Sequence, residues 1–226
     1  ASDVYKRQVI IAGLYENRKL MSYCSQVISR EVTAYHFVQM CTVRRKCTMI
    51  KRIGLLTSGG DCQALNATMR GVAKTLYNAD PDTQIIGILE GYKGLMYEKY
   101  VEMKPLDFSG ILTEGGTILG SSRQPFKNMR KPDANGMDKV AAMVNTYHKL
   151  KLDCLVILGG NGTHKSANML REEGLNVVSL PKTIDNDLWG TDMTFGFQSA
   201  VDVATNAIDC IHTTAASHGR VFIVEV

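Results

Sequence analysis

Two segments of the chain repeat one arrangement, in which a short apolar run is followed by a glycine-rich loop and then by a helical pattern. Ile53–Leu56 leads into Thr57–Ala67, and Asp153–Leu158 leads into Gly159–His164. Glycine allows the backbone to approach a ligand closely, and the following helix adds free N–H groups and a favourable dipole for an anion. Neither loop has the Gly-Lys-Ser/Thr ending of a Walker A motif or the G-x-G-x-x-G spacing. The arrangement restricts the chain to strand–helix alternation and favours a phosphate or nucleotide site at the strand ends.

A third loop places two carboxylates close together. Pro181–Asp187 follows the apolar run Leu175–Leu180 and holds Asp185 and Asp187 two positions apart. Polar loops after apolar strands deliver side chains to the end of a sheet, where open α/β sheets keep their sites. The two acids suggest a division of roles, with one as a proton acceptor and the other on a divalent cation. The alternative for this loop, taken alone, is a capped turn with exposed acids.

The remaining patterns extend the alternation and predict an α/β fold with a mainly parallel sheet flanked by helices. We expect strands at Arg52–Thr57, Gln84–Leu89, Asp153–Leu158, Val177–Leu180 and Arg220–Val226. We expect helices at Ala64–Tyr77, Met137–Leu150, His164–Glu173 and Gln198–Thr213. Helical spacing assigns three apolar stripes to the core: Leu65, Met69, Val72 and Leu76; Met137, Val140, Val144 and Tyr147; and Val201, Ala204, Ile208 and Ile211.

The charge distribution argues against a nucleic-acid-binding face. The formal net charge is +4, but residues 1–48 carry eight Lys/Arg and three Asp/Glu, whereas the remainder carries 18 basic and 19 acidic residues. No apolar run approaches the ~20 residues of a membrane-spanning helix. The six cysteines form no C-x-x-C pair, and apolar surroundings predict that Cys154 and Cys210 are buried, reduced thiols. We therefore expect a cytoplasmic protein with no nucleic acid and no membrane as partner.

Five segments of the chain, in their order and spacing, resemble those of the phosphofructokinases. They are Ile53–Asp61, Glu90–Leu95, Gly115–Arg123, Gly159–Thr163 and Pro181–Asp187, and the resemblance extends from about residue 51 to residue 226. It implies a phosphofructokinase-like fold of Rossmann-like layers. A donor-binding domain is expected over 49–197 and the start of a second, sugar-binding domain over 198–226, truncated before it is complete. Residues 1–48 are expected to be a non-native leader, with a genuine regulatory or oligomerising extension as the alternative.

The resemblance also implies an activity and a set of donor-binding residues. A 6-phosphofructokinase transfers the γ-phosphoryl group of ATP to the 1-hydroxyl of fructose 6-phosphate in glycolysis, and some members use diphosphate instead. By their match to the family's motifs, Gly60 offers a backbone N–H to the transferred phosphate, and Arg123 and Gln124 bind the donor. The donor nucleotide is expected to be lined by Gly159, Gly160, Asn161, Gly162 and Thr163.

The same match implies how the sugar and the metal bind. Asp185 corresponds to the base that takes the proton from the attacking 1-hydroxyl. Asp187 and Asn161 are expected to help hold Mg²⁺, although asparagine is a weaker ligand than the aspartate usual at that position. Arg220 corresponds to an arginine that reaches the 6-phosphate across a subunit interface, which implies a homo-oligomer (a dimer or tetramer); its alternative is a surface cation. Contacts to the sugar phosphate are assigned to Thr183, Ile184 and Asp185.

Two positions give opposite indications of the donor. Lys182 is typical of diphosphate-using members, whereas Gly162 leaves room for the α-phosphate of a nucleotide that a carboxylate would obstruct. We expect ATP as the donor, because a lysine can coexist with a bound nucleotide, and diphosphate is the alternative. A second alternative is a catalytically silent nucleotide-sensing module, against which the presence of Asp185 argues. His164 is expected to be a polar loop residue without a catalytic role, and Tyr92 is expected to pack in the core or a loop.

Overall fold

The computed structural model describes residues 51–225, so the expected leader over 1–48 lies outside the described residues. Those residues form a six-stranded sheet with the order β3-β2-β1-β4-β5-β6. Every neighbouring pair of strands is parallel except β2 and β3, which are antiparallel. The mainly parallel α/β fold expected from the alternation is therefore confirmed. The strands are β1 (Arg52–Thr57), β2 (Gln84–Ile88), β3 (Tyr100–Met103), β4 (Cys154–Gly159), β5 (Val177–Thr183) and β6 (Phe195–Gly196).

The central strands are apolar on both faces because helices cover both sides of the sheet. Alternate side chains of a strand point to opposite faces, and they divide here between two separate cores. Leu56 of β1 packs into one core with Ile157 of β4. Leu55 of β1 packs into the other core with Val156 of β4. A strand buried on both faces reads as a continuous apolar run, which explains why β1 and β4 are recognisable in the sequence.

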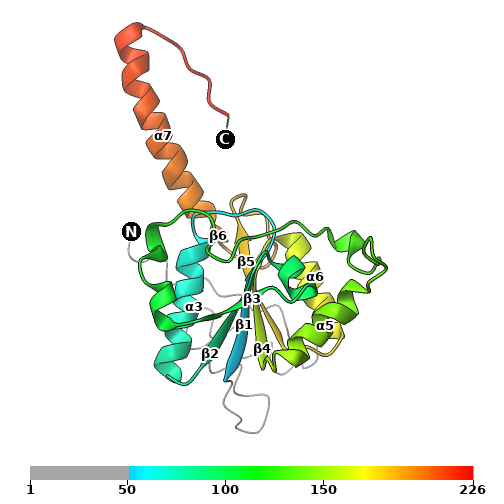
Figure 1. Ribbon diagram of the computed structural model, residues 1–226. Coiled ribbons are helices and arrows are strands. Elements are labelled where there is room, and N and C mark those ends of the chain that lie inside the picture. Colours follow the sequence, from blue (N-terminus) through cyan, green and yellow to red (C-terminus); the bar gives the residue numbers. More distant parts are fainter. Residues whose placement is uncertain (1–50, 226) are drawn as a thin grey trace.

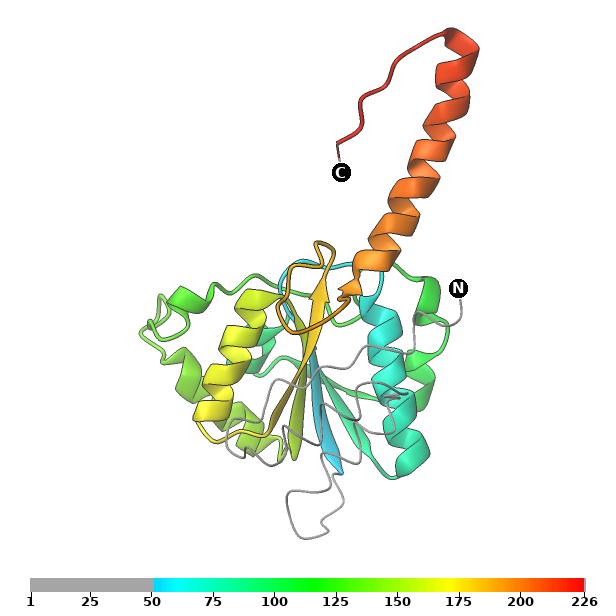
Figure 2. The ribbon, with the colours of Figure 1, turned by 180° about the vertical axis from the view of Figure 1, so that it is seen from behind.

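Two helical layers enclose the sheet (Figures 1 and 2). One face carries α3 (Leu65–Ala79), together with the short 3₁₀ helices η2 (Pro105–Phe108) and η3 (Ile111–Thr113). The other face carries α4 (Tyr92–Met96), α5 (Lys139–Lys149) and α6 (Asn161–Glu172). A further 3₁₀ helix, η4, spans Phe126–Asn128, and the last helix is α7 (Phe197–His218). The apolar stripes predicted on α3 and α5 pack into these two cores, as expected.

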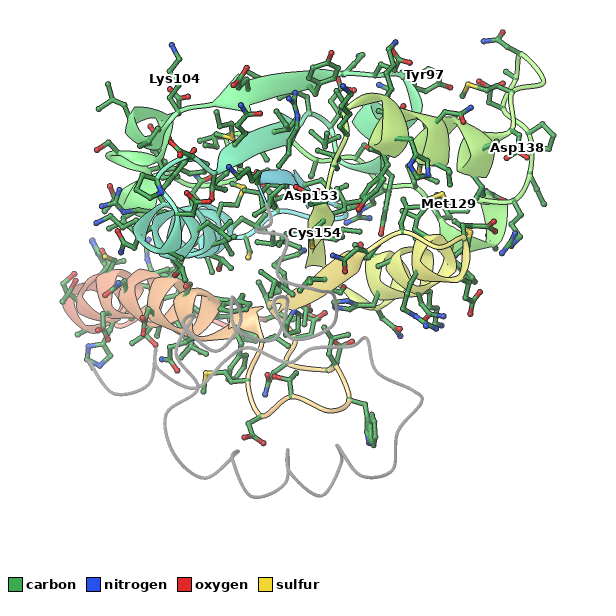
Figure 3. All side chains as sticks on the ribbon, turned by 90° about the horizontal axis from the view of Figure 1, so that it is seen from below. Tyr97, Lys104, Met129, Asp138, Asp153 and Cys154 are labelled. Atoms are coloured by element: carbon green, nitrogen blue, oxygen red, sulfur yellow. The ribbon has the colours of Figure 1, made fainter. Side chains whose placement is uncertain are left out.

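One aspartate fixes the amino-terminal edge of the sheet. The Oδ2 atom of Asp153 accepts hydrogen bonds from the backbone N–H groups of Lys51 (2.9 Å) and Arg52 (2.8 Å). The view onto this edge shows Asp153 and Cys154 near the middle of the sheet, between the two helical layers (Figure 3). The aspartate thereby joins the start of β1 to the start of β4 and sets their parallel register.

Four of the five predicted strands and all four predicted helices are present, with ends shifted by a few residues. Helix α7 continues to His218, beyond the expected end at Thr213, and α6 begins at Asn161 instead of His164. The first hydrogen bond of α6 runs from the His164 N–H to the Gly160 carbonyl oxygen (3.0 Å), so the glycine loop itself opens the helix. The sequence reading missed α4, β3 and β6, whose five, four and two residues are too short to show a period.

Three expectations near the end of the chain are wrong. No residue of α7 is buried, so the stripe of Val201, Ala204, Ile208 and Ile211 does not enter a core. Cys210, on the same helix, is exposed rather than buried. The reason is visible in Figures 1 and 2: α7 leaves the sheet at β6 and extends away from both helical layers. An apolar stripe predicts which face of a helix can be buried, but burial also requires a neighbouring element that packs against that face.

The third wrong expectation is the strand at Arg220–Val226. Residues 220–225 form no strand, and Val226 lies outside the described residues. The Arg220 N–H bonds back to the Ala215 carbonyl oxygen (3.0 Å), as part of the left-handed C-cap that Gly219 gives to α7. A strand needs a neighbouring strand to take its N–H and C=O groups, and the apolar side chain of Ile223 is 96% exposed here.

Candidate functional site

The three loops singled out in the sequence lie at the carboxyl ends of β1, β4 and β5, which are neighbours in the sheet. The chain leaves β1 through α3 toward β2 and leaves β4 through α6 toward β5, in opposite directions along the sheet. The carboxyl ends of β1 and β4 therefore form a topological switch point, which is where open α/β sheets bind ligands. The Ser58 N–H donates to the Leu158 carbonyl oxygen (2.9 Å) and joins the two strands at this edge of the sheet.

The first glycine loop meets the segment that carries Arg123. Gly59 has a φ of +90°, a left-handed conformation that favours glycine. Its N–H donates to the Ser122 carbonyl oxygen (3.2 Å), and its own carbonyl oxygen accepts from the Ser121 hydroxyl (2.8 Å). A Cβ atom at Gly60 would lie 3.7 Å from Nη2 of Arg123. The structure therefore brings Gly60 and Arg123 together.

Lys182 joins this loop to the end of β5. Its side chain is 6% exposed, and its Nζ donates a hydrogen bond to the Gly60 carbonyl oxygen. Burial lowers the pKa of Lys182; the nearby carboxylates of Asp61 and Asp185 oppose that shift, and the Arg123 guanidinium adds to it. One buried ammonium group thus lies among two carboxylates and a second cation. Lys182 therefore has a structural contact at this loop in addition to its expected relation to the donor.

A buried tyrosine supports the second glycine loop. The Tyr92 hydroxyl donates to the Thr163 carbonyl oxygen (2.8 Å), and burial raises the pKa of that phenol. Tyr92 therefore packs in the core, as expected, and also supports the first turn of α6. The Thr163 hydroxyl donates to the Ser58 carbonyl oxygen (3.4 Å), and a Cβ atom at Gly159 would lie 2.5 Å from the Thr163 side chain. A Cβ atom at Gly162 would meet nothing within 4 Å, so open space faces that position.

The acidic loop is closed by its own side chains. Asn186 has a φ of +51°, and its Oδ1 accepts from the Thr194 N–H (2.9 Å). The Thr194 hydroxyl donates to the Thr183 carbonyl oxygen (2.7 Å), and the Thr183 hydroxyl accepts from the Asp185 N–H (3.1 Å). These bonds fix the backbone while leaving the carboxylates of Asp185 and Asp187 exposed to solvent. The loop therefore has a hydrogen-bonded backbone and two solvent-exposed acids, an arrangement that fits both a capped turn and a ligand-binding loop.

The oxygen-bearing side chains fit a cation that binds together with a phosphate. Within residues 51–225 no three or more His, Cys, Asp or Glu side chains are grouped as a complete metal site. Mg²⁺ usually takes one or two carboxylates and completes its shell with water and substrate phosphates, so a complete protein cage is not needed. Asp187 and Asn161 both expose their side chains at the loops described above and are the candidates for this role.

Not every predicted residue is brought to these loops. Arg220 directly follows Gly219, the C-cap of α7, at the end of that helix far from the sheet (Figure 1). Ile184 is 51% exposed, while Gln124 is half-buried next to Arg123. The expectation that His164 is a loop residue is wrong, because His164 lies in the first turn of α6. Its Nδ1 bonds to the Ser179 hydroxyl, and burial lowers the pKa of its imidazole.

Some residues at the site were missed because they act on backbone atoms far away in the sequence. Thr57 and Asn66 are both fully buried and bond to the segment before Arg123, 48 to 63 residues away. Asp61 lies beside Lys182 and received no role. Buried polar residues flanking a glycine loop were the available signal, since buried polar side chains are almost always hydrogen-bonded.

Comparison with known proteins identifies the family. Residues 52–226 match the family described as Phosphofructokinase. The chain belongs to the phosphofructokinase family. Its match to the ATP-dependent 6-phosphofructokinase of Spirochaeta thermophila is 58% identical over 179 residues, which is 78% of this chain and 49% of the relative. The match to ATP-dependent 6-phosphofructokinase 3 of Bacteroides thetaiotaomicron is 49% identical over 176 residues, covering 77% of this chain and 52% of the relative.

A solved structure agrees with this assignment. Phosphofructokinase from Saccharomyces cerevisiae superposes with a TM-score of 0.68 at 30% identity, covering 78% of this chain and 26% of that one. The phosphofructokinase fold expected from the sequence is thereby confirmed for the described residues. The chain spans about half the length of the curated phosphofructokinases it matches.

Proposed function

We propose that the protein is a 6-phosphofructokinase, which transfers the γ-phosphoryl group of ATP to the 1-hydroxyl of fructose 6-phosphate and yields fructose 1,6-bisphosphate and ADP. The observation that carries the proposal is that two distant segments meet the first glycine loop at Gly60. The Gly60 carbonyl oxygen binds Lys182 at the end of β5, and Arg123 approaches Gly60 from the segment after η3. Phosphoryl transfer needs mainly positioning and neutralisation of the moving charge, and this cluster offers both.

The donor side consists of the two glycine loops. The backbone N–H of Gly60 faces the transferred phosphoryl group, and the guanidinium of Arg123 pairs with donor phosphate oxygens. Gln124 lies beside it, and the nucleotide follows the loop formed by Gly159, Gly160, Asn161, Gly162 and Thr163. Gly160 is the N-cap of α6, so the helix N-terminus behind this loop favours the negative charge of the phosphates.

The acceptor side is the acidic loop. Asp185 takes the proton of the 1-hydroxyl as that oxygen attacks phosphorus, and ADP leaves on the opposite side. Its backbone is held by the Thr183 hydroxyl, which supports a fixed approach of the carboxylate. Thr183 and Ile184 contact the sugar phosphate beside it. The Asp185 carboxylate is near enough to Lys182 to favour the charged form of that ammonium group, although burial lowers the pKa of Lys182 on balance.

Asp187 and the amide oxygen of Asn161 would hold Mg²⁺, directly or through water. The bound ion would supply positive charge against the phosphates, which otherwise repel the incoming oxygen. The single carboxylate in this pair leaves much of the coordination shell to the donor phosphates and water, as is common for this ion.

Two observations bear on the donor. The open space at Gly162 favours ATP, since nothing within 4 Å of that position would obstruct an α-phosphate. The relatives from Spirochaeta thermophila and Bacteroides thetaiotaomicron are both named ATP-dependent. Lys182, a marker of diphosphate-using members, binds the Gly60 carbonyl oxygen here and is thus compatible with either donor. Diphosphate is the second candidate on account of this residue.

Helix α7 begins the sugar-binding domain, and Arg220 binds the 6-phosphate of a sugar in a neighbouring subunit of a homo-oligomer. The exposed position of Arg220 at the end of α7 supports a role toward another chain.

Within residues 51–225, no helix combines the length and apolarity required to cross a membrane. We place the enzyme in the cytoplasm.

Kinetics of the full-length protein with Mg²⁺, fructose 6-phosphate and either ATP or diphosphate test the proposal. We expect transfer from ATP and a loss of at least 100-fold in kcat for Arg123→Ala, because removing a charge-stabilising group costs about that much. Arg130→Ala is the matched control, since Arg130 is an exposed arginine paired with Glu173 (3.2 Å) and should leave kcat unchanged. Absence of transfer from both donors would contradict the proposed function.

A further inference from the structure

We propose that Asn66, together with Thr57, is a positioning residue that holds residues 114–123 against the first glycine loop and so places Arg123 opposite Gly60. The inference rests on the proposed donor-binding role of Arg123. Both side chains are fully buried, and both bind the backbone of a segment about 50 to 60 residues away in the sequence.

Asn66 holds the start of this segment from the first turn of α3. Its side chain is fully buried, its Nδ2 donates to the Glu114 carbonyl oxygen (3.1 Å), and its Oδ1 accepts from the Ile118 N–H (2.9 Å). The orientation of the amide is fixed by these partners. A flipped amide would set N–H against N–H and oxygen against oxygen. One side chain therefore binds two backbone groups of opposite polarity, four residues apart.

Thr57 holds the next part of the segment from the end of β1. Its hydroxyl is buried, and it donates to the Gly120 carbonyl oxygen (2.9 Å). The Thr57 and Thr117 hydroxyl oxygens are 3.0 Å apart. A hydroxyl has a single hydrogen to donate, so Thr117 is the donor in this second bond. The segment is thus bound at Glu114 and Ile118 by Asn66 and at Thr117 and Gly120 by Thr57.

The final residues before Arg123 are bound to the glycine loop itself. Ser121 and Ser122 exchange hydrogen bonds with the carbonyl oxygen and N–H of Gly59. The Ser122 hydroxyl also donates to the Glu90 carbonyl oxygen (2.6 Å). Residues 114–122 therefore run along the first glycine loop from α3 to Gly59, and Arg123 comes directly after the last attached residue. Arg123 itself is exposed, so its place depends on this backbone more than on packing of its own side chain.

Two variants remove the attachment with little change of shape. Asn66→Asp replaces the donor to Glu114 by an oxygen that repels the carbonyl group, and Thr57→Val removes the hydroxyl in a residue of equal shape. Thr146→Val is the matched control, because Thr146 is also buried and its hydroxyl bonds to the Ala142 carbonyl oxygen (3.0 Å) within α5, far from the segment.

Amide hydrogen exchange of the full chain, followed by mass spectrometry, measures the attachment without any substrate. We expect exchange over residues 114–122 to accelerate about tenfold or more in Asn66→Asp and Thr57→Val, since each loses buried hydrogen bonds. Peptides from β4 should be unaffected in both, and Thr146→Val should leave residues 114–122 as in the wild type. Exchange within twofold of wild type in both loop variants would overturn the proposal, and Thr57→Val decides it if Asn66→Asp does not fold.

A double-mutant cycle then separates positioning from a general loss of stability. In the full-length enzyme, Asn66→Asp should lower kcat about tenfold or more in the wild-type background but less than twofold in the Arg123→Ala background, because the group being positioned is already gone. Equal losses in both backgrounds would overturn the link to Arg123. If the wild-type protein transfers no phosphoryl group, the proposed function fails, and the exchange experiment still decides whether Asn66 and Thr57 hold the segment.

Discussion

Lys182, at the end of β5, donates a hydrogen bond to the carbonyl oxygen of Gly60 in the loop after β1, although 122 residues separate them in the sequence. The bond crosses over β4, which lies between those two strands in the sheet. A buried ammonium needs anionic or polar partners, and Lys182 finds them in this carbonyl group and in the nearby Asp61 and Asp185 carboxylates. The charge of Lys182 is therefore part of how the loops hold together.

The charge of Lys182 should set an alkaline limit to donor binding. Burial lowers the pKa of Lys182 from its ordinary value of 10.5, so the ammonium group loses its proton at a lower pH than an exposed lysine would. We expect the KM for the donor to rise as the pH increases toward that value. Lys182→Arg stays charged throughout this range and should move the rise to higher pH. If the KM for the donor depends on pH identically in the two proteins between pH 8 and pH 10, the charge of Lys182 does not contribute to donor binding.

Asp185→Asn should lower kcat by about a thousandfold or more while changing donor affinity by less than threefold. Only the ability to take the proton is lost, because the Asp185 N–H that bonds to Thr183 belongs to the backbone and remains. Steady-state kinetics and isothermal titration with ATP measure the two quantities. Asp192→Asn is a control in the same loop, since Asp192 is exposed and interacts through its backbone carbonyl oxygen (3.3 Å from Nδ2 of Asn186). A kcat within a few-fold of wild type would rule out Asp185 as the base.

Gly162→Asp should weaken the use of ATP at least tenfold more than the use of diphosphate. The open space around Gly162 accommodates the side chain, so the fold should persist and the new carboxylate should act on the α-phosphate by contact and by charge. Gly162→Ala fills part of the same space without charge and should have a smaller effect. Paired measurements of kcat/KM with each donor are needed. A wild-type preference for diphosphate would show that Lys182, and not Gly162, indicates the donor.

Gly94→Ala should destabilise the protein by about 3 kcal/mol or more, which is typical of severe overpacking in a core. A Cβ atom at Gly94, in α4, would lie 1.8 Å from the backbone carbonyl oxygen of Leu89, which cannot move without disturbing the turn after β2. Gly71→Ala is the contrasting variant, because Gly71 lies inside α3 with nothing within 4 Å of the added atom. It should stabilise by up to about 1 kcal/mol. Chemical denaturation measures both, and equal stability of the two variants would contradict the packing described for α4.

The parts of the fold that the sequence predicted are those governed by local pattern. The apolar runs of β1 and β4 are buried on both faces and are followed by glycine-rich loops, so the position of each strand in the sequence can be predicted from its own residues. The edge strand β3 contains Glu102 and exposed Tyr100, and nothing in its four residues distinguishes it from a loop. The stripe on α7 had the correct helical period, but whether a helix face is covered depends on distant parts of the protein.

The same distinction holds at the site. Parallel strands end at one edge of a sheet, so the convergence of the loops after β1, β4 and β5 could be predicted from the alternation of strands and helices. The bonds that hold these loops could not, because Lys182, Thr57 and Asn66 bind backbone atoms, and every residue has the same backbone groups to offer. A sequence shows which side chains are able to donate, but it does not indicate which of them do so or which carbonyl group accepts.

The direction of the strands also has a practical use. All the loops discussed above lie at the carboxyl edge, and the turn between α6 and β5 lies at the opposite edge, which Asp153 fixes. In that turn, Gly174 is exposed, has a φ of +93° and would present an added atom to open solvent. Exposed turns of this kind accept inserted segments well. A fluorescent reporter or an affinity tag inserted at Gly174 would therefore allow the protein to be followed or immobilised with the loops at the carboxyl edge free.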